Sequence, residues 1–284
     1  MNTRNLLPAL LLMLLLPFGA EATRIYTDIA RALENPDDVH ILRLPFNKLD
    51  SVPIIITQFR NLEELDLSNN RIKKLPDYLF ACKNLKTLKL FRNKLKQIPN
   101  GITQLTHLED AIFGYNQLTE IPDSLCYMTS LRSLNFSGNT IAHIPTAIGN
   151  LHHLERFIIS YNELETVPDE LAQCTNLKLL DLGNNKLENL PKNFGNLTHL
   201  SYLYMSYNRL ENIPQSIGNC SALQELDVVY CGVMRLPDEL NQLMQLEEVY
   251  VDSRTILFYQ NPRLRRRQNI HIVDGGSFPY RSSQ

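Results

Sequence analysis

Asparagine recurs at one fixed interval along most of this chain, and that interval constrains the fold more than any other feature. Eight asparagines follow one another with a constant 23-residue period and a cysteine takes the ninth place: Asn47, Asn70, Asn93, Asn116, Asn139, Asn162, Asn185, Asn208 and Cys231. Proline keeps the same period six positions further on, at Pro53, Pro76, Pro99, Pro122, Pro145, Pro168, Pro191, Pro214 and Pro237. A single-copy fold gives no reason for such a period, so we predict a stack of similar units.

Each unit opens with apolar residues spaced as in a strand. Leu62, Leu65 and Leu67 precede Asn70, and the other units repeat this spacing. The pattern LxxLxLxx alternates between two faces, and the later proline cannot donate to a ladder. We therefore expect one short strand and one return segment per unit. Strands of equal register pair in parallel about 4.8 Å apart, which predicts a curved solenoid with a concave sheet and convex returns.

The complete unit, LxxLxLxxNxLxxLPxxLxxC, resembles the leucine-rich repeat family, in its LPxxIxxLxxL subclass. The resemblance implies an α/β fold, a right-handed solenoid or horseshoe, whose returns are short helices, 3-10 turns or extended segments. We place nine full repeats and one partial repeat in residues 39–260. They start at Val39, Leu62, Leu85, Leu108, Leu131, Leu154, Leu177, Leu200, Leu223 and, for the partial repeat, Leu246.

The asparagine column is predicted to be structural. The turn after each strand leaves buried backbone groups that neither strand nor water can satisfy, and an inward asparagine offers two donors and an acceptor to neighbouring coils. We expect the eight asparagines to form a ladder, with Cys231 in the ninth place.

The first 22 residues have the features of a secretory signal peptide. Arg4 precedes an apolar run at residues 6–16, and Ala20-Glu21-Ala22 forms a cleavage site. An uncleaved membrane anchor is the alternative, but the run is shorter than the roughly 20 residues that a spanning helix needs. We therefore expect an exported protein, secreted, periplasmic or at the cell surface, whose mature chain starts at Thr23 and has no transmembrane segment.

Both ends of the solenoid should be capped. Residues 23–38 are predicted to form an N-terminal cap, a helix with Ile25, Ile29 and Leu33 on one face that Pro36 stops. Residues 261–284 are predicted to be a C-terminal cap and tail, with a short helix from Asn261 and a closing strand at residues 270–273. The helix carries Arg263, Arg265, Arg266 and Arg267, which either cover the cap or bind anionic lipid or nucleic acid.

Three of the five cysteines are interpreted as core residues rather than disulfides, Cys231 belongs to the asparagine column, and Cys126 is expected on the convex side with no partner in register. Cys82, Cys174 and Cys220 take a convex core position that leucine fills in other repeats. Cys174 and Cys220 are two repeats apart, which separates them by about 10 Å, beyond disulfide reach. No metal site or cofactor is expected.

Charges on the concave face are predicted to pair along the stack. One outward column alternates in sign: Glu63, Lys86, Glu109, Arg132, Glu155 and Lys178. Because residues one repeat apart lie side by side, this order predicts a ladder of ion pairs that also disfavours a shifted register. Arg43, Asp66 and Lys89 are expected to follow the same logic.

The outward strand positions of later repeats become apolar or aromatic. They are Ile112, Tyr115, Ile158, Tyr161, Tyr202, Tyr204, Tyr207, Tyr230 and Tyr250, with an acidic rim of Glu225, Asp227, Glu247, Glu248 and Asp252. Strands favour tyrosine and isoleucine in general. Their concentration in the later repeats instead predicts a recognition patch, because rigid aromatics with polar tips are frequent binding hot spots.

The predicted function is that of a secreted, non-enzymatic scaffold that binds a protein or peptide partner on its concave face, as the resemblance implies. The alternative is glycan recognition by the same tyrosines, stacking on sugar rings. A net charge of −2 gives no reason to expect nucleic acid. The sequence has no P-loop, HExxH, CxxC or GxSxG motif. Sequons at Asn135, Asn196 and Asn219 matter only in a host that glycosylates exported proteins.

Overall fold

The computed structural model describes residues 25–232, 236–254 and 269–273, and in these residues the strands form one parallel sheet. Neighbouring strands pair in chain order, and their Cα partners are one repeat apart over most of the stack, as in Leu65 with Leu88. The strands are β1 (Ile25–Tyr26), β2 (Ile41–Arg43), β3 (Glu64–Asp66), β4 (Thr87–Lys89), β5 (Asp110–Ile112), β6 (Ser133–Asn135), β7 (Arg156–Ile158), β8 (Leu179–Asp181), β9 (Tyr202–Tyr204), β10 (Glu225–Asp227), β11 (Glu248–Val251) and β12 (Asn269–Ile272).

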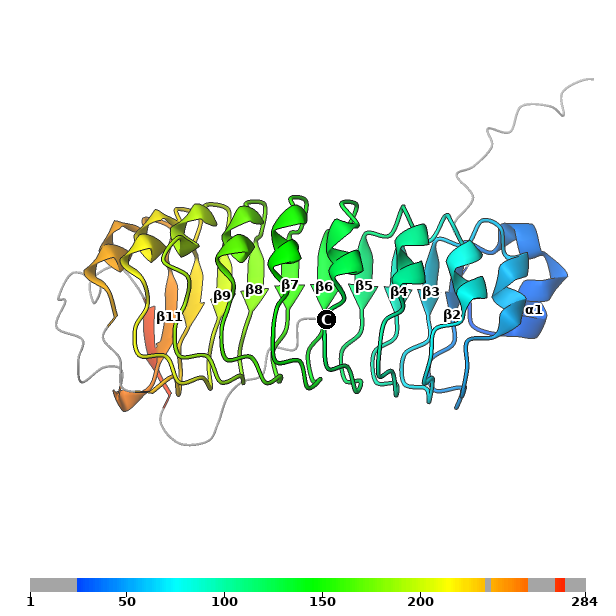
Figure 1. The fold of residues 1–284 in the computed structure, drawn as a ribbon, viewed down its shortest axis with the longest axis horizontal. Helices are drawn as coiled ribbons and strands as arrows, with labels where there is room; N and C mark the ends of the chain where they lie inside the picture. Colours follow the sequence, from blue (N-terminus) through cyan, green and yellow to red (C-terminus); the bar gives the residue numbers. More distant parts are fainter. Residues whose placement is uncertain (1–24, 233–235, 255–268, 274–284) are drawn as a thin grey trace, which may run out of the picture.

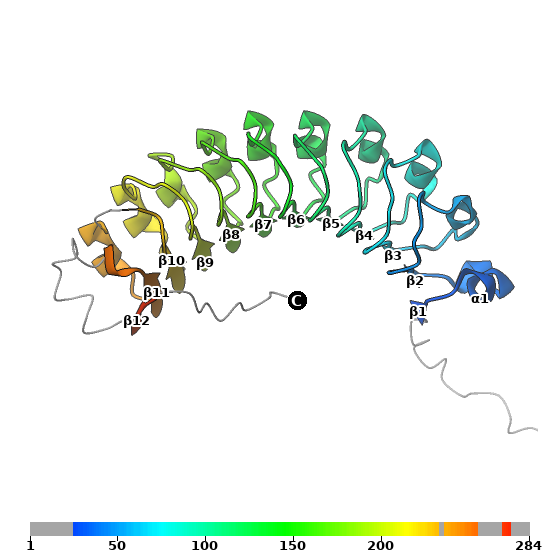
Figure 2. The ribbon, with the colours of Figure 1, turned by 90° about the horizontal axis from the view of Figure 1, so that it is seen from below.

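The return segments contain short 3-10 helices on the outer side of the arc (Figure 1, Figure 2). Most begin directly after the repeated proline, which fixes an extended backbone ahead of the turn. They are η1 (Pro36–Asp38), η2 (Ile54–Gln58), η3 (Asp77–Ala81), η4 (Asn100–Gln104), η5 (Asp123–Tyr127), η6 (Thr146–Asn150), η7 (Asp169–Gln173), η8 (Phe194–Asn196), η9 (Gln215–Asn219) and η10 (Asp238–Gln242). Strands line the concave side, so the predicted horseshoe fold is confirmed.

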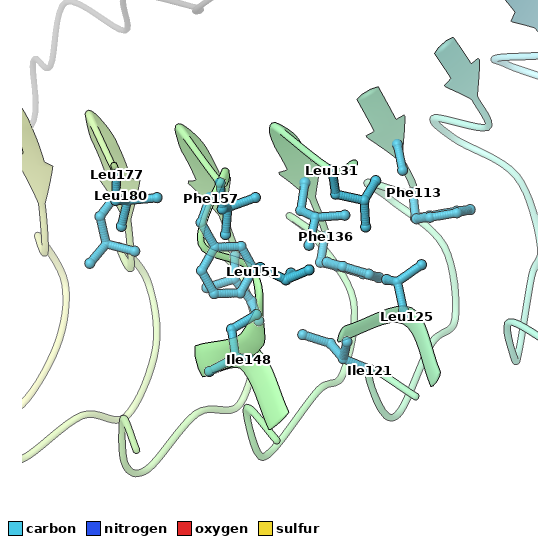
Figure 3. Packing of buried hydrophobic residues seen from close by; sticks show 14 of the residues in the cluster. Phe113, Ile121, Leu125, Leu131, Phe136, Ile148, Leu151, Phe157, Leu177 and Leu180 are labelled. Carbon is cyan, nitrogen blue, oxygen red and sulfur yellow. The ribbon is translucent and has the colours of Figure 1, made fainter. Parts of the chain in front are cut away.

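The core lies between the sheet and the returns. The inward strand residues Leu65, Leu134 and Leu180 are fully buried. Phe113, Phe136 and Phe157 belong to the same core in the middle of the stack (Figure 3). The rings of Phe113 and Phe136 stack with centroids 5.5 Å apart. Burying each such side chain stabilises the fold by about 1.5–3 kcal/mol. Each coil therefore depends on its neighbours for a dry interior.

All five cysteines are buried and free, which confirms Cys82, Cys174 and Cys220 as core residues. Cys126 lies in the core as well. The Sγ atom of Cys174 donates to the carbonyl oxygen of Ile148 in the preceding coil at 3.2 Å. Burial raises the pKa of the Cys174 thiol to about 12. The thiols therefore remain protonated at physiological pH.

The N-terminal cap differs from its prediction. The helix α1 spans Ile29–Glu34 only, starting after Asp28, whose side chain accepts the N–H of Arg31. Ile25 and Tyr26 form β1 instead and pair with β2, because the open edge of the first strand needs backbone partners. Ala32, rather than Leu33, is the buried helix residue.

The C-terminal cap is described only in part. The predicted closing strand forms as β12, which pairs with β11. The predicted helix from Asn261 and its four arginines lie outside the described residues, as does the predicted signal peptide.

Seven asparagines join their coils to the preceding coil. In each, Oδ1 accepts the N–H of the residue 21 positions earlier, and Nδ2 donates to the carbonyl 26 positions earlier and to carbonyls of its own turn. Six of the seven are buried, and Asn116 is half-buried. Cys231 keeps the bond to the preceding coil through Sγ, which donates to Met205 O at 2.9 Å.

Asn47 does not take part in this ladder, which corrects its assignment. Its side chain is exposed and donates to the carbonyl of Pro45, two residues earlier. The reason is positional: the partners of a ladder asparagine lie one coil earlier, and before Asn47 the chain has the cap instead of a repeat.

A second polar column, which the sequence interpretation missed, joins the coils ahead of the strands. Nδ2 of Asn84 donates to Arg60 O at 2.9 Å, and Nδ2 of Asn176 donates to His152 O at 2.7 Å, each 24 residues earlier. The Nδ1 atom of His199 lies 2.9 Å from Thr175 O, so it must carry the ring proton. The signal was available, because asparagine and histidine recur just before the first leucine of many repeats.

Candidate binding surface on the concave side

The predicted charge ladder forms on the concave side except between Lys86 and Glu109, which make no ion pair in the described part of the chain. Nζ of Lys86 lies 2.7 Å from a carboxylate oxygen of Glu63, and Nζ of Lys178 lies 2.6 Å from Glu155. Arg132 bridges two carboxylates, at 3.6 Å to Glu109 and 3.1 Å to Glu155. The hydrogen bond from Lys178 lowers the pKa of Glu155, as that from Lys86 lowers the pKa of Glu63. These charges are satisfied within the chain, so they offer little to a ligand.

The second charged column departs from its prediction. Arg43 and Lys89 both pair with Glu64, at 2.9 and 3.0 Å, rather than with Asp66. Oδ1 of Asp66 instead accepts the backbone N–H of Ser68 at 2.8 Å. The short aspartate side chain reaches the backbone N–H two residues later, in the turn. Because Asp66 makes this bond, its carboxylate does not pair with Arg43 or Lys89.

The predicted aromatic patch, here called the tyrosine surface, consists of Tyr115, Tyr161, Tyr202, Tyr204, Tyr207, Tyr230 and Tyr250 with Ile112 and Ile158. Five of the nine belong to strands β5, β7, β9 and β11. Tyr115, Tyr161, Tyr207 and Tyr230 do not, since they follow the strands at the turn just before the asparagine column or Cys231. The turn tyrosines therefore lie along one edge of the sheet, beside its concave face.

This turn position has left-handed backbone in nine successive coils. Its occupants are Phe46, Asn69, Arg92, Tyr115, Gly138, Tyr161, Asn184, Tyr207 and Tyr230, with φ between 53° and 66°. Glycine and asparagine adopt this conformation readily, whereas other residues do so at a cost of roughly 1–2 kcal/mol. Four tyrosines at this position are thus unfavourable for folding. Strain of this kind is concentrated at functional sites.

Several of the aromatic side chains pack against other rings, and Tyr250 stacks on His271 with ring centroids 4.6 Å apart. The rings of Tyr207 and Tyr230 have centroids 5.0 Å apart, near the C-terminal end of the stack. Tyr115 instead packs edge-on against Phe91 at 5.1 Å, with the guanidinium of Arg92 5.4 Å from its ring centroid. Gly138 makes room for this ring, because a Cβ atom there would lie 2.9 Å from it.

Exposure differs among the tyrosines, both in the turns and in the strands. Tyr115, Tyr161, Tyr202 and Tyr207 are 37–44% exposed, whereas Tyr204, Tyr230 and Tyr250 are half-buried. Burial, reinforced by the carboxylate of Glu225, raises the pKa of the Tyr204 hydroxyl. That hydroxyl is hydrogen-bonded to Glu225, so it is held by the protein rather than turned outward.

The predicted acidic rim is smaller than the sequence indicated. Asp227 and Asp252 are buried, 7% and 2% exposed, and their Oδ1 atoms accept the N–H groups of Val229 and Arg254. The carboxylates left at the surface belong to Glu225, Glu247 and Glu248. Burial raises the pKa of Asp227 to about 6 and also raises that of Asp181, which accepts from Ser160 Oγ at 2.8 Å. The aspartates therefore shape the turns beneath the tyrosines.

Among the described residues, no group of three or more histidine, cysteine, aspartate or glutamate side chains is placed to hold a metal ion. None of the helices in that part of the chain has the length and apolar character needed to cross a membrane.

Comparisons with known proteins agree with the geometry. The leucine-rich repeat region family matches residues 171–270, and two further leucine-rich repeat families match residues 60–110 and 130–151. The chain is therefore a leucine-rich repeat protein. A comparison with curated proteins gave no match.

Solved structures share the fold. An internalin from Listeria monocytogenes is 22% identical, with a TM-score of 0.73, over 89% of this chain and 72% of the internalin. A TDR receptor is 28% identical, with a TM-score of 0.69, over 76% of this chain and 40% of the receptor. The plant peptide hormone receptor RGFR1 in complex with RGF2 is 26% identical, with a TM-score of 0.60, over 78% of this chain and 41% of the receptor. The chain thus spans about two fifths of each receptor.

Proposed function

We propose that this protein is an exported, non-enzymatic scaffold that binds a protein or peptide on its tyrosine surface. The observation that carries the proposal is the left-handed turn column, where tyrosine stands in four coils although asparagine and glycine fit the backbone better. Tyr161 and Tyr207 are exposed there. Backbone strain at exposed residues is concentrated at functional sites, and tyrosine is enriched in binding hot spots. We therefore assign these tyrosines to contacts with a partner.

The comparisons support a peptide or protein rather than a small molecule. One structure of similar fold is a peptide hormone receptor in complex with its ligand. The carboxylate of Glu225 lies beside Tyr204, and Glu247 is exposed just before the next strand in the same C-terminal part of the stack, so this end suits a basic partner. Nothing in the matches or in the described geometry points to catalysis.

The left-handed turn allows a binding test that keeps the fold. Asparagine occupies the same position at Asn69 and Asn184. The double variant Tyr161→Asn, Tyr207→Asn should therefore fold like wild type. Peptides selected on the wild-type chain from a random-peptide display library should bind this variant at least about tenfold more weakly. Phe46→Asn, at the same turn position far from the tyrosines, is the matched control and should bind normally.

The same proteins separate peptide from glycan recognition. A glycan array probed with wild type and the tyrosine variant should show no tyrosine-dependent signal. Tyrosine-dependent binding to sugars, without any to peptides, would favour the glycan alternative. If the tyrosine variant binds every selected peptide like wild type, the proposed surface is wrong.

Export and the division of the chain belong to the proposal as well. We infer a signal peptide at residues 1–22, an N-terminal cap at 23–38, repeats of the LPxxIxxLxxL subclass with a 23-residue period at 39–260, and a C-terminal cap and tail at 261–284. N-terminal sequencing of the protein recovered outside the cytoplasm should begin at Thr23. Recovery of a chain that begins at Met1 would contradict the cleavage.

A further inference from the structure

A hollow lined only by lysine and glutamine lies on the flank of the solenoid where the chain runs from the turns to the returns. Its volume is about 650 Å³, and its lining consists of Lys73, Lys74, Lys94, Lys96, Gln97 and Gln117. All six residues are exposed. No aromatic residue lines this hollow, and the aliphatic parts of the lysine and glutamine side chains form most of its walls.

The cations of this flank stand in register with one another. Lys94 N donates to Ile72 O and Gln117 N donates to Leu95 O, so these segments of successive coils run side by side. Lys73 and Lys96 are one repeat apart and thus occupy the same place in adjacent coils, as do Arg71 and Lys94. Neighbouring like charges on paired segments are destabilising.

On the concave face, by contrast, opposite charges are neighbours. There the signs alternate from coil to coil, as in Glu63 and Lys86, whose charges pair at 2.7 Å. On the flank, Arg71, Lys73, Lys74, Lys94 and Lys96 form no ion pair within the described part of the chain. These five cations, in a protein of net charge −2, create a local positive potential that attracts anions.

We propose that this flank binds an acidic polysaccharide, a linear chain whose sulfate or carboxylate groups pair with the lysines. Gln97 and Gln117 supply amide groups for sugar hydroxyls. The lining has no aromatic side chain on which nucleic-acid bases could stack. A hollow also fits a chain better than it fits the flat surface of a membrane. Asp50, one repeat before Lys73, and Glu120, one repeat after Gln97, bound the site on its two sides. Further along the flank, the carboxylates that would also repel a polyanion are those of Glu163, Glu165, Glu188 and Glu211.

The test uses heparin as the probe, with the full chain and a pair of charge-matched variants. Lys73→Gln with Lys96→Gln removes two cations from the hollow. Lys192→Gln with Arg209→Gln removes two exposed cations elsewhere, Arg209 lying on the same flank in a later repeat. Circular dichroism melts establish that all three proteins are folded.

The hollow variant should bind heparin about tenfold or more weakly than wild type, with a shallower dependence of log Kd on log salt concentration, because fewer counterions are released. The control variant should stay within about twofold of wild type. Carboxylated polygalacturonate, duplex DNA and anionic phosphatidylserine vesicles are compared at the same salt concentration.

Equal heparin binding by the two variants would overturn the proposal. So would binding to duplex DNA or to the vesicles that is tighter than binding to both polysaccharides and depends on the same lysines. A lysine-dependent dimer in light scattering would assign the flank to a second copy of this chain, through its acidic segment, instead of a polysaccharide. Tyr161 and Tyr207, which test the proposed function, belong to later coils than the hollow, so none of these results affects that function.

Discussion

The side-chain oxygen of Asn139 accepts the backbone N–H of Leu118, 21 residues earlier, at 2.9 Å. Nδ2 of the same side chain donates to Phe113 O at 3.1 Å and to Phe136 O at 2.8 Å. One amide thus satisfies groups in two coils. This arrangement explains why the asparagine column is the most regular feature of the sequence.

Asn139→Leu should lower the free energy of unfolding by about 2–4 kcal/mol, because several buried backbone groups lose their partners at once. The measurement is urea unfolding followed by circular dichroism. Asn47→Leu is the matched control, since Asn47 is exposed and lies outside the ladder; it should change stability by less than about 0.5 kcal/mol. Equal losses in the two variants would contradict the structural role of the ladder.

Asp227→Asn should change how stability depends on pH. Burial raises the pKa of this carboxyl from 3.8 to about 6. The folded state therefore holds the proton more tightly than the unfolded state, so the contribution to stability is complete below about pH 4 and is lost as the pH rises through about 6. The shift corresponds to a loss of the order of 3 kcal/mol at neutral pH.

Asparagine should keep the local bond, because Asn135, in the same column, accepts the N–H of Ser137 through Oδ1 at 2.9 Å. The Asp227→Asn variant is thus expected to gain stability relative to wild type as the pH rises from 4 to 7 in urea titrations. A difference between the two proteins that stays constant over this range would show that Asp227 is not the titrating group.

Tyr161→Asn should leave the free energy of unfolding unchanged or raise it by up to about 1 kcal/mol, because it relieves left-handed strain. Its column neighbours Gly138 and Asn184 are not aromatic, so no ring stack within the column is lost. Asn184→Tyr, the reverse change, should lower stability by a similar amount. The idea fails if both substitutions destabilise the protein equally in chemical unfolding.

The native cysteines should react slowly with a thiol-specific reagent at pH 8. All five are buried, and burial raises their pKa values, to about 11 for Cys82 and about 12 for Cys220. Little reactive thiolate is then present. Ellman titration should give few thiols in the native protein and five after denaturation in guanidinium. Rapid labelling of the native chain would place a cysteine at the surface.

Glu155→Lys should lower stability by about 1 kcal/mol at low salt, because it sets three cations side by side where Arg132 and Lys178 now share a carboxylate. The loss should shrink in 0.5 M salt through screening. Glu165→Lys makes the same charge change in the same coil away from the ladder, and its effect should be smaller. A salt-independent loss at position 155 would point to packing rather than charge.

Much of the fold could be predicted because the period converts sequence columns into spatial rows. The parallel sheet, the buried leucines, the free cysteines and the pairing of Glu155 with Lys178 all depend on neighbours that are one repeat apart. Each of these follows from local alternation and stacking. The exceptions, such as Asn47 and Ile25, lie at the end of the stack. No repeat precedes them in the sequence, so no residue of an earlier repeat can serve as their partner.

The sequence by itself determined which residues share a row, because a strict repeat fixes the register of every coil against the next. Only the tertiary structure decided what each row does. In the folded chain, the carboxylates of Asp66 and Asp227 accept backbone N–H groups of the turns. Four tyrosines lie in left-handed turns beside the sheet, and lysines of neighbouring coils line a hollow on the flank. The physical reason is that side-chain bonds and backbone handedness depend on the path of the chain between strands, which periodicity alone does not specify.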